Sequence, residues 1–388
     1  MRRQTGVVEQ SRVAGETVDA FIPYRLPPAD PPISLGGELG ELLDRAGERL
    51  GLLELAGDLV PSVEWFVYAF VRKEAVLSAQ IEGTQATLMD LLEVEASGET
   101  PEHDDVAQVC GYVDALGHAW EELGRDSGLP VSMRLLSATH RRLLSGARGA
   151  NKQPGEVRRS QNWIGGTRSG NARFVPPPPH RLGELLGELE RFVHDESDLP
   201  PLVRIGMIHV QFETIHPYLD GNGRLGRLLI TLLLRHWRLL SRPLLYLSLF
   251  LKIHRQEYYR RLDAVRSEGD WEGWLAFFLE GVASVADEAV ATARRLHAIV
   301  EESRGRLIAR DDATVIGIRL FELLPAHPIV TVNRVVDLIG CSRPAAAKAL
   351  RVLEAAGILR AMDDRKKNRA FLFGEYLDLL RQGTETGA

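Results

Sequence analysis

Cysteine is scarce in this chain, since Cys110 and Cys341 are the only two among 388 residues. They lie far apart in sequence, which argues against a disulfide scaffold and against a metal site built from thiolates. The N-terminal residues 1–4 are followed by polar residues and not by an apolar segment with a cleavage site, so no signal peptide is visible. A reducing, cytoplasmic location is the default expectation.

Long apolar runs and an excess of positive charge are also missing. The longest apolar run, near Leu228, is interrupted by Arg235 and His236, so we expect no segment that spans a bilayer. The formal net charge of −6 excludes a general polyanion-binding protein. Any contact with nucleic acid must therefore come from a local patch. With 45% hydrophobic and 26% charged residues, the composition is that of a globular protein of two or three domains.

Helical periodicity dominates the pattern of apolar residues and predicts a mainly α fold. Residues 1–35, rich in proline, are expected to run extended over another surface. The helical ranges are 35–59 (interpreted as a helix pair), 61–92, 105–144, 181–194, 201–214, 228–240, a helix around residues 258–259, one from residue 271, and a long connector at 285–308.

One stretch in the first two thirds of the chain differs in kind. Residues 155–175 contain two short β-like runs around a glycine-rich turn, which predicts a β-hairpin in an otherwise helical region. The prolines at 176–179 end it. Trp163, Trp271 and Trp274 are interpreted as core residues.

The C-terminal residues 314–380 follow another order. Helices are expected at 316–324, 332–339 and 343–356, then a strand from Gly357, a basic loop at 365–369 and a strand at 370–373. This order is typical of a winged helix-turn-helix. Residues 343–369 contain eight basic and three acidic side chains, a local charge of +5. Winged helices bind either DNA or proteins, and both partners stay open.

The twelve residues from His216 to Arg227 contain several side chains that could bind a phosphate or transfer a proton. A glycine-rich turn before a helix gathers backbone N–H groups that bind an anion. Arg224 and Arg227 lie three residues apart, so on a helix they share a face and can hold the same phosphates. Asp220 is a hard oxygen ligand suited to Mg²⁺ beside phosphates, although an Asx-turn role is an alternative. His216 has a side chain whose pKa suits proton removal near neutrality.

This segment resembles the signature of the Fic family, His-x-Phe-x-(Asp/Glu)-Gly-Asn-Gly-Arg-x-x-Arg, with Tyr218 in place of the usual Phe. The resemblance covers about residues 60–285. It implies a helical Fic core with a β-hairpin flap, and an ATP-dependent protein adenylyltransferase. His216 would take the proton from a target hydroxyl, which would then attack the α-phosphate of ATP. Asp220 would hold Mg²⁺.

The resemblance also assigns the nucleotide contacts. Gly221, Asn222 and Gly223 would form the phosphate cradle, and Arg224 and Arg227 would bind the phosphate tail. The flap would register a target segment by strand addition, although a simple structural hairpin is the alternative. Further candidates for nucleotide contact are two glycines near the flap turn, Gly165 and Gly166. Two aromatic residues, Phe250 and Tyr258, are candidates to line the adenine pocket, although aromatic residues at helical spacing are more often core residues.

A second motif lies upstream. Ser78-x-x-x-Glu82-Gly83 resembles the inhibitory motif (Ser/Thr)-x-x-x-Glu-(Gly/Asn) of many Fic proteins. On a helix, Ser78 and Glu82 lie one turn apart on one face. The resemblance implies that Glu82 pairs with Arg227 and prevents it from binding the γ-phosphate. In some relatives the same glutamate positions a water that removes AMP.

The expected organisation resembles that of bacterial class II Fic proteins. It comprises an N-terminal arm and inhibitory helix region (1–100), a catalytic core (101–285), a helical connector (286–313) and a winged helix-turn-helix (314–388). The leading hypothesis is an autoinhibited adenylyltransferase. The alternatives are AMP removal or another nucleotidyl transfer, and a DNA-binding regulator with a Fic sensor core. The expected partners are ATP, a protein with a hydroxyl side chain, and DNA at residues 343–369. A second copy of the chain is a further expected partner, since dissociation of such a dimer is one way to relieve inhibition.

Overall fold

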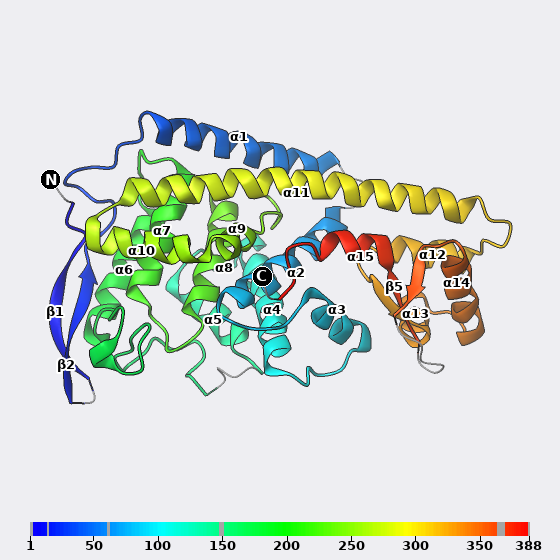
Figure 1. Cartoon of the computed structure of the whole chain (residues 1–388), viewed down its shortest axis with the longest axis horizontal. Helices are drawn as coiled ribbons and strands as arrows, with labels where there is room; N and C mark the ends of the chain where they lie inside the picture. Colours follow the sequence, from blue (N-terminus) through cyan, green and yellow to red (C-terminus); the bar gives the residue numbers. More distant parts are fainter. Residues whose placement is uncertain (1–2, 14, 60–62, 147–150, 363–368, 387–388) are drawn as a thin grey trace.

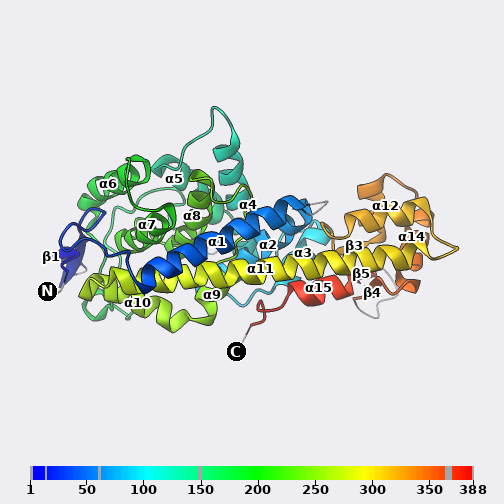
Figure 2. The same ribbon diagram turned by 90° about the horizontal axis from the view of Figure 1, so that it is seen from above.

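The computed structural model describes residues 3–13, 15–59, 63–146, 151–362 and 369–386, and it is mainly helical. The molecule is elongated, and the long helix α11 (Trp271–Ile308) runs along most of its length with α1 (Glu38–Leu59) packed beside it (Figures 1 and 2). Within the described ranges, none of the helices combines the length and the apolarity needed to cross a membrane.

The core of the molecule is built around α7, which is buried on every side. All of its residues from Leu202 to Ile215 are buried, including the polar Arg204, His209, Gln211 and Glu213, which therefore need partners inside the core. The helices of this part of the molecule are α2 (Val63–Ile81), α3 (Leu88–Ser97), α4 (Asp104–Gly124), α5 (Met133–Leu143), α6 (Leu182–His194), α7 (Pro201–Ile215), α8 (Asn222–His236), α9 (Ser248–Ile253) and α10 (Arg255–Glu268), with short 3₁₀ turns η1 (Ser169–Asn171) and η2 (Pro179–Arg181).

Several boundaries differ from the sequence prediction. The expected helix pair at 35–59 is the single helix α1. The helix expected from Leu228 begins six residues earlier, at Asn222, because Gly221 adopts the left-handed conformation that precedes its first turn. The last helix of the core and the connector are one continuous helix, α11, so the boundary placed between residues 285 and 286 lies inside a helix.

The N-terminal residues form a β-hairpin, which the sequence did not predict. Strands β1 (Gly6–Val13) and β2 (Glu16–Pro23) pair antiparallel with Gly6 opposite Pro23. In β2 the alternate residues Val18, Ala20 and Ile22 are buried, which is the period of a half-buried strand. The proline-rich extended segment is confined to the residues that follow.

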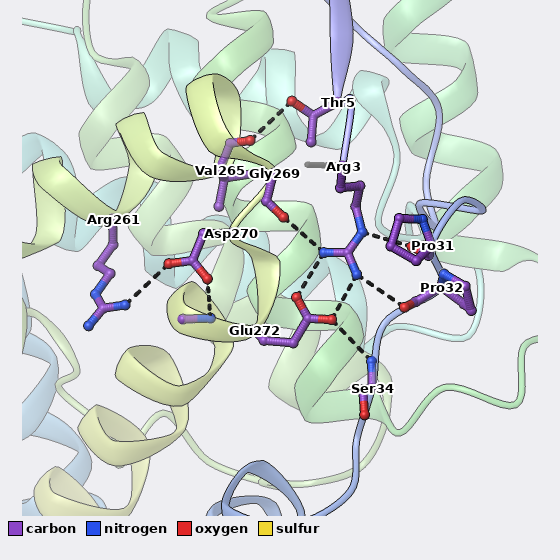
Figure 3. Close-up of polar contacts among 11 residues, drawn as sticks. Arg3, Thr5, Pro31, Pro32, Ser34, Arg261, Val265, Gly269, Asp270 and Glu272 are labelled. Atoms are coloured by element: carbon purple, nitrogen blue, oxygen red, sulfur yellow. Dashed lines mark hydrogen bonds and ion pairs between the residues drawn. The ribbon is translucent and has the colours of Figure 1, made fainter. Parts of the chain in front are cut away.

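Arg3 fixes this N-terminal arm to the corner between α10 and α11 (Figure 3). Its guanidinium donates to both carboxylate oxygens of Glu272, each at 2.8 Å, and to the carbonyls of Pro31 at 2.7 Å and Gly269 at 2.8 Å. The Thr5 hydroxyl donates to the Val265 carbonyl at 3.0 Å. The arm is therefore held by a nearly buried, charge-assisted set of contacts.

The flap, residues 155–175, doubles back as predicted but forms less regular structure than expected. Its only described ladder contact is one antiparallel bridge between Ile164 and Phe174. Both Gly165 and Gly166 have positive φ, and η1 lies in the bend, so the two sides separate beyond the bridge. Trp163 is 39% exposed, so its interpretation as a core residue was wrong, whereas Trp271 and Trp274 are buried.

The C-terminal elements occur in the predicted order with two additions, a short strand and a final helix. They are α12 (Val315–Leu323), β3 (Ile329–Thr331), α13 (Val332–Ile339), α14 (Arg343–Ala355), β4 (Leu359–Ala361), β5 (Ala370–Phe373) and α15 (Gly374–Leu380). Strand β3 was missed because three residues directly before a helix carry almost no periodicity. The three strands form an antiparallel sheet in the order β3-β5-β4. Of the basic loop, residues 365–368 lie outside the described residues.

Candidate active site

His216 lies directly after α7 in a conformation that is uncommon for histidine. Its φ and ψ are 49° and 61°, in the left-handed region, and its N–H donates to the Phe212 carbonyl at 2.9 Å. This conformation ends the helix and turns the chain towards the glycine-rich loop. A non-glycine residue is strained there, so surrounding contacts must hold the backbone.

Side chains from two helices, α8 and α5, hold the loop that follows. Asn222 closes it: its side-chain oxygen accepts from the Tyr218 N–H at 2.9 Å and its amide donates to the Tyr218 carbonyl at 2.8 Å. His140 contacts the Asp220 carbonyl at 2.9 Å through Nε2, and its Nδ1 accepts from the Gly155 N–H at 2.8 Å. The Nε2 of His140 therefore carries the proton. The His140 ring also stacks on Tyr218 with ring centroids 3.9 Å apart.

Arg227 donates hydrogen bonds to the end of α2. Its Nε donates to the Ser78 hydroxyl at 2.9 Å, and its Nη2 donates to the Ser78 carbonyl and to Glu82 Oε1, each at 2.8 Å. The Arg227 side chain is 2% exposed, whereas that of Glu82 is 36% exposed. The structure therefore brings together the two upstream residues singled out in the sequence and the second arginine of the motif.

Glu82 is ionised in this arrangement. Burial raises the pKa of its carboxyl, but the Arg227 guanidinium, helped by Arg224, outweighs that effect and lowers the pKa below its usual value. Gly223 lies against the same carboxylate, because a Cβ at this position would overlap Glu82 Oε1. The glycine is therefore required by the close approach of Glu82 to the first turn of α8.

Arg224 differs from Arg227 in that its guanidinium is only partly engaged. Nη1 donates to Gln108 at 2.8 Å, and Nη2 lies 3.6 Å from Asp220. Its side chain is buried, and its Nε has no hydrogen-bond partner within the part of the chain that the structure describes. Two buried arginines in the first turns of a helix, where cations are disfavoured, indicate an anion-binding site.

The imidazole of His216 is neutral near pH 7. Burial lowers its pKa to about 4, and the nearby Arg158 guanidinium acts in the same direction, while the Glu213 carbonyl and Glu82 oppose it. The Nδ1 of His216 is buried without a hydrogen-bond partner among the described residues. A neutral ring at the end of the loop has the protonation state that a general base requires.

Asp220 is the candidate metal ligand. Its side chain is 43% exposed at the mouth of the loop, and one oxygen accepts from the Gly221 N–H at 2.6 Å. Among the described residues, no group of three histidine, cysteine or acidic side chains lies together as a metal site. A single hard carboxylate fits Mg²⁺, which keeps several waters and is shared with substrate phosphates, and does not fit a metal held by protein alone.

Four further candidates lie outside the loop from His216 to Arg227, although Tyr258 is close enough to Arg227 for each to affect the pKa of the other. Phe250 packs in the core against Gly281 and Phe277. Tyr258 is 1% exposed, and its hydroxyl contacts Nε2 of His209 at 2.8 Å. The burial of both rings does not support their prediction as adenine-pocket walls. Gly165 and Gly166 lie in the exposed bend of the flap, where their nearest neighbours are flap residues.

Sequence reasoning missed several buried polar residues around the site. His140 and Arg158 contact the loop from α5 and from the base of the flap. Glu74 lies inside α2, accepts from the Ser248 hydroxyl at 2.5 Å and from its N–H at 3.0 Å, and burial raises its pKa to about 7. A charged residue within an apolar run, such as Glu74 between Phe70 and Val76, was the one feature of the sequence that could have indicated a buried polar group.

A helical core that presents a neutral histidine, a glycine turn and buried arginines at a helix N-terminus defines a phosphate-binding protein of the nucleotide-handling class. Comparison with known families makes this specific. Residues 40–121 match the model of the Fic/DOC family N-terminal region, and residues 130–234 match that of the Fic/DOC family. The matched segments, residues 40–121 and 130–234, are thus similar to both regions of the Fic/DOC family.

Curated relatives match about half of the chain. It is 30% identical over 209 residues to "Protein adenylyltransferase Fic" of Drosophila persimilis, covering 52% of this chain and 37% of that protein. The protein of the same name from Culex quinquefasciatus is 29% identical over 209 residues, covering 52% and 38%. The chain thus spans less than half of the length of these relatives.

Solved structures show the same fold. A Fic family protein from Desulfovibrio desulfuricans G20 matches with a TM-score of 0.56 and 21% identity, covering 88% of this chain and 97% of that one. Fic-1 from C. elegans matches with a TM-score of 0.52 and 20% identity, covering 66% and 73%. At these identities the likeness concerns the fold alone.

Proposed function

We propose that this chain is a protein adenylyltransferase that transfers AMP from ATP to a serine, threonine or tyrosine hydroxyl of a target protein and of itself. The observation that carries the proposal is the neutral imidazole of His216, placed at the end of α7 directly before the glycine turn that opens α8. The printed name of the curated relatives agrees with this activity.

In the proposed reaction, His216 accepts the proton of the target hydroxyl. The hydroxyl oxygen forms a bond to the α-phosphorus, the bond between that phosphorus and the bridging oxygen breaks, and pyrophosphate leaves. The backbone N–H groups at the start of α8 and the guanidinium of Arg224 bind the phosphates. Asp220 would hold Mg²⁺, which supplies positive charge beside the phosphates when bound.

We further propose that the enzyme is autoinhibited by Glu82. Arg227 donates to Glu82 and to Ser78, and these contacts occupy the donors that would otherwise bind the terminal phosphate of ATP. Removal of AMP is the alternative outcome for the same site, since Glu82 is ionised and lies beside the glycine turn, where it can orient a water.

The test is incubation of the protein with each nucleoside triphosphate and Mg²⁺, followed by intact mass measurement. Glu82→Gly is expected to gain the mass of AMP from ATP at least roughly ten-fold faster than the wild type, because a charge-assisted hydrogen bond to Arg227 is removed. Adding His216→Ala to Glu82→Gly is expected to abolish the gain and retain ATP binding.

The matched control is Glu64→Gly, which removes an exposed acidic residue from the first turn of the same helix and leaves Arg227 occupied. Self-modification by Glu82→Gly at the wild-type rate would contradict the inhibitory role. Modification by a nucleotide other than ATP would assign another nucleotidyl transfer, and undiminished modification by the double variant would contradict the role of His216.

We also propose that residues 314–386 form a winged helix-turn-helix that contacts DNA. The support is the order of α13, the Gly340 turn and α14, followed by the antiparallel strands β4 and β5. Two of the basic side chains are already paired, Arg360 with Asp378 and Arg369 with Glu354. Salt-dependent gel-shift binding is the expected result, and no binding at low salt would leave this unit as a protein-docking module.

A further inference from the structure

Arg158 is a buried cation that the proposed mechanism has not yet used. It lies at the base of the flap and is 1% exposed. No carboxylate in the described part of the chain pairs with it, and burial alone lowers its pKa to about 10. An unpaired buried charge is costly unless it is well solvated by dipoles, so its surroundings must supply them.

Backbone carbonyls supply those dipoles. Nε donates to His216 at 2.9 Å, and Nη2 donates to Pro177 at 2.5 Å and, more weakly, to Ile215 at 3.4 Å. Nη1 donates to Ser160 at 3.2 Å. These carbonyls belong to two groups: the end of α7 with the His216 residue itself, and the two stems of the flap.

The hydrogen bonds of Arg158 lie at a part of the backbone that is unfavourable by itself. The last carbonyls of α7 have no intrahelical partner, and His216 holds a left-handed conformation that costs an L-residue about 1–2 kcal/mol. The Arg158 N–H also donates to the Pro217 carbonyl at 2.9 Å. Side chain and backbone of one residue thus bind the successive carbonyls of His216 and Pro217.

The same guanidinium acts on the imidazole electrostatically. Charged groups face His216 from three elements: Arg158 from the flap stem, Glu82 from α2 and Arg266 from α10. Arg158 has the largest effect of the three and disfavours the protonated ring. Glu82 opposes it, and Arg266 adds a smaller effect of the same sign as Arg158.

We propose that Arg158 is a positioning residue that fixes the backbone of His216 and joins it to both stems of the flap, so that a protein segment docked on the flap presents its hydroxyl to the imidazole. The inference rests on the proposed transfer reaction. It makes the flap and His216 one structural unit, in which the positive charge of Arg158 adds to the effect of burial in disfavouring protonation of the imidazole.

The first experiment needs no enzymatic activity. Protein labelled with ¹³C-histidine is titrated between about pH 5.5 and 8, and the His216 signal is assigned by its loss in His216→Asn. The signal is expected not to titrate in the parent protein. In Arg158→Gln the midpoint is expected to rise but to stay below the ordinary histidine value of about 6.5, because burial still lowers the pKa, so the signal begins to titrate at the acid end of this range, whereas Arg158→Lys keeps a charge and stays flat.

The matched control is Arg159→Gln, because the neighbouring Arg159 side chain is 85% exposed and pairs only with Glu156. A His216 signal in Arg158→Gln that stays as flat as in the parent would overturn the electrostatic part of the inference. This readout remains valid even if no nucleotide transfer is ever observed, so its failure is distinct from failure of the proposed function.

The second experiment separates positioning from mere folding. In the Glu82→Gly background, Arg158→Lys is expected to lower kcat for self-modification at least roughly ten-fold with an unchanged KM for ATP, because the fork that binds several carbonyls is lost. Arg159→Gln should leave both unchanged. If Arg158→Gln does not fold, Arg158→Lys still decides, and an unchanged kcat in that variant would overturn the positioning role.

Discussion

The N-terminal arm (residues 3–34) and the C-terminal segment (residues 382–386) both return to the core that carries the site, but they contact different parts of it. The arm contacts the flap: Glu16 accepts from the Ser169 hydroxyl at 2.9 Å and from the Gly170 N–H at 2.7 Å. The C-terminal segment contacts the helix that carries Glu82, because the Gln80 side chain donates to the Thr384 carbonyl at 2.8 Å. One end therefore contacts the flap, and the other contacts the helix that carries Glu82.

The two ends also differ in how firmly they are held. The arm is fixed by the charge-assisted pair between Arg3 and Glu272, in which the Arg3 side chain is 6% exposed. The C-terminal segment is held by the hydrogen bond from Gln80 and by two from Lys252, to the Gly383 carbonyl at 3.1 Å and to the Glu385 carbonyl at 2.9 Å. Because few and partly exposed contacts open at low free energy, the C-terminal segment is the one suited to release.

Arg3→Ala is expected to have the largest effect on stability. The variant loses a bidentate pair and leaves the Glu272 carboxylate without its main partner, which costs about 2 kcal/mol after allowance for the partial exposure of Glu272. Urea unfolding measures the loss. Arg12→Ala, an exposed position on β1, is the control and is expected to change stability by less than about 0.5 kcal/mol.

The Arg3 effect should depend on pH in a defined direction. The hydrogen bond from Arg3 lowers the pKa of Glu272, so the pair stabilises the fold above the unfolded pKa of that carboxyl and loses its contribution as pH falls through the folded value. The difference between Arg3→Ala and the wild type should therefore shrink in acid. An equal difference at acid and neutral pH would contradict the assignment to this pair.

The catalytic loop was more predictable from the sequence than either end of the chain. The run from His216 to Arg227 concentrates glycine, charge and histidine. Helical spacing placed Ser78 and Glu82 on one face, and the family resemblance implied the pairing of Glu82 with Arg227. The arm was read from its prolines as extended, and the short alternation of β2 was overlooked. Its anchor, Arg3, pairs with a residue 269 positions away, and no local pattern predicts such a contact.

The residues that hold the backbone of the site could not be predicted from the sequence either. Arg158 and His140 act through backbone carbonyls and amides, which every residue possesses, so nothing in the sequence marks their partners. The wrong placement of Trp163 in the core has the same origin. An aromatic residue in a short β-like run is usually buried, and only the bend at Gly165 and Gly166 exposes it.

Glu16→Ala tests the arm side of the comparison with a smaller expected effect. Loss of the contacts to Ser169 and Gly170 should cost about 1 kcal/mol locally. Hydrogen exchange at residues 168–175 should accelerate roughly five-fold, with ATP affinity unchanged. Glu9→Ala is the control, because Glu9 lies on the same hairpin and pairs with His180 outside the flap bend. Equal exchange in the two variants would remove the proposed link between arm and flap.

Gln80→Ala tests the C-terminal side and has the smallest expected effect. Gln80 lies two residues before Glu82 and donates to the Thr384 carbonyl and to the Ala86 carbonyl at 2.9 Å. Loss of these bonds, worth about 1 kcal/mol net, should loosen the end of α2 and raise self-modification with ATP and Mg²⁺ up to roughly five-fold, well below the effect of Glu82→Gly.

Lys252→Ala separates the two contacts of Gln80, because Lys252 holds the C-terminal segment through the Gly383 and Glu385 carbonyls without touching α2. If the segment restrains Glu82, Lys252→Ala should also raise self-modification, and combining it with Gln80→Ala should add little, since both break one connection. If only Gln80→Ala raises the rate, the restraint lies in the turn after α2. The C-terminal segment would then be a structural neighbour of the inhibitory helix and not a part of its control.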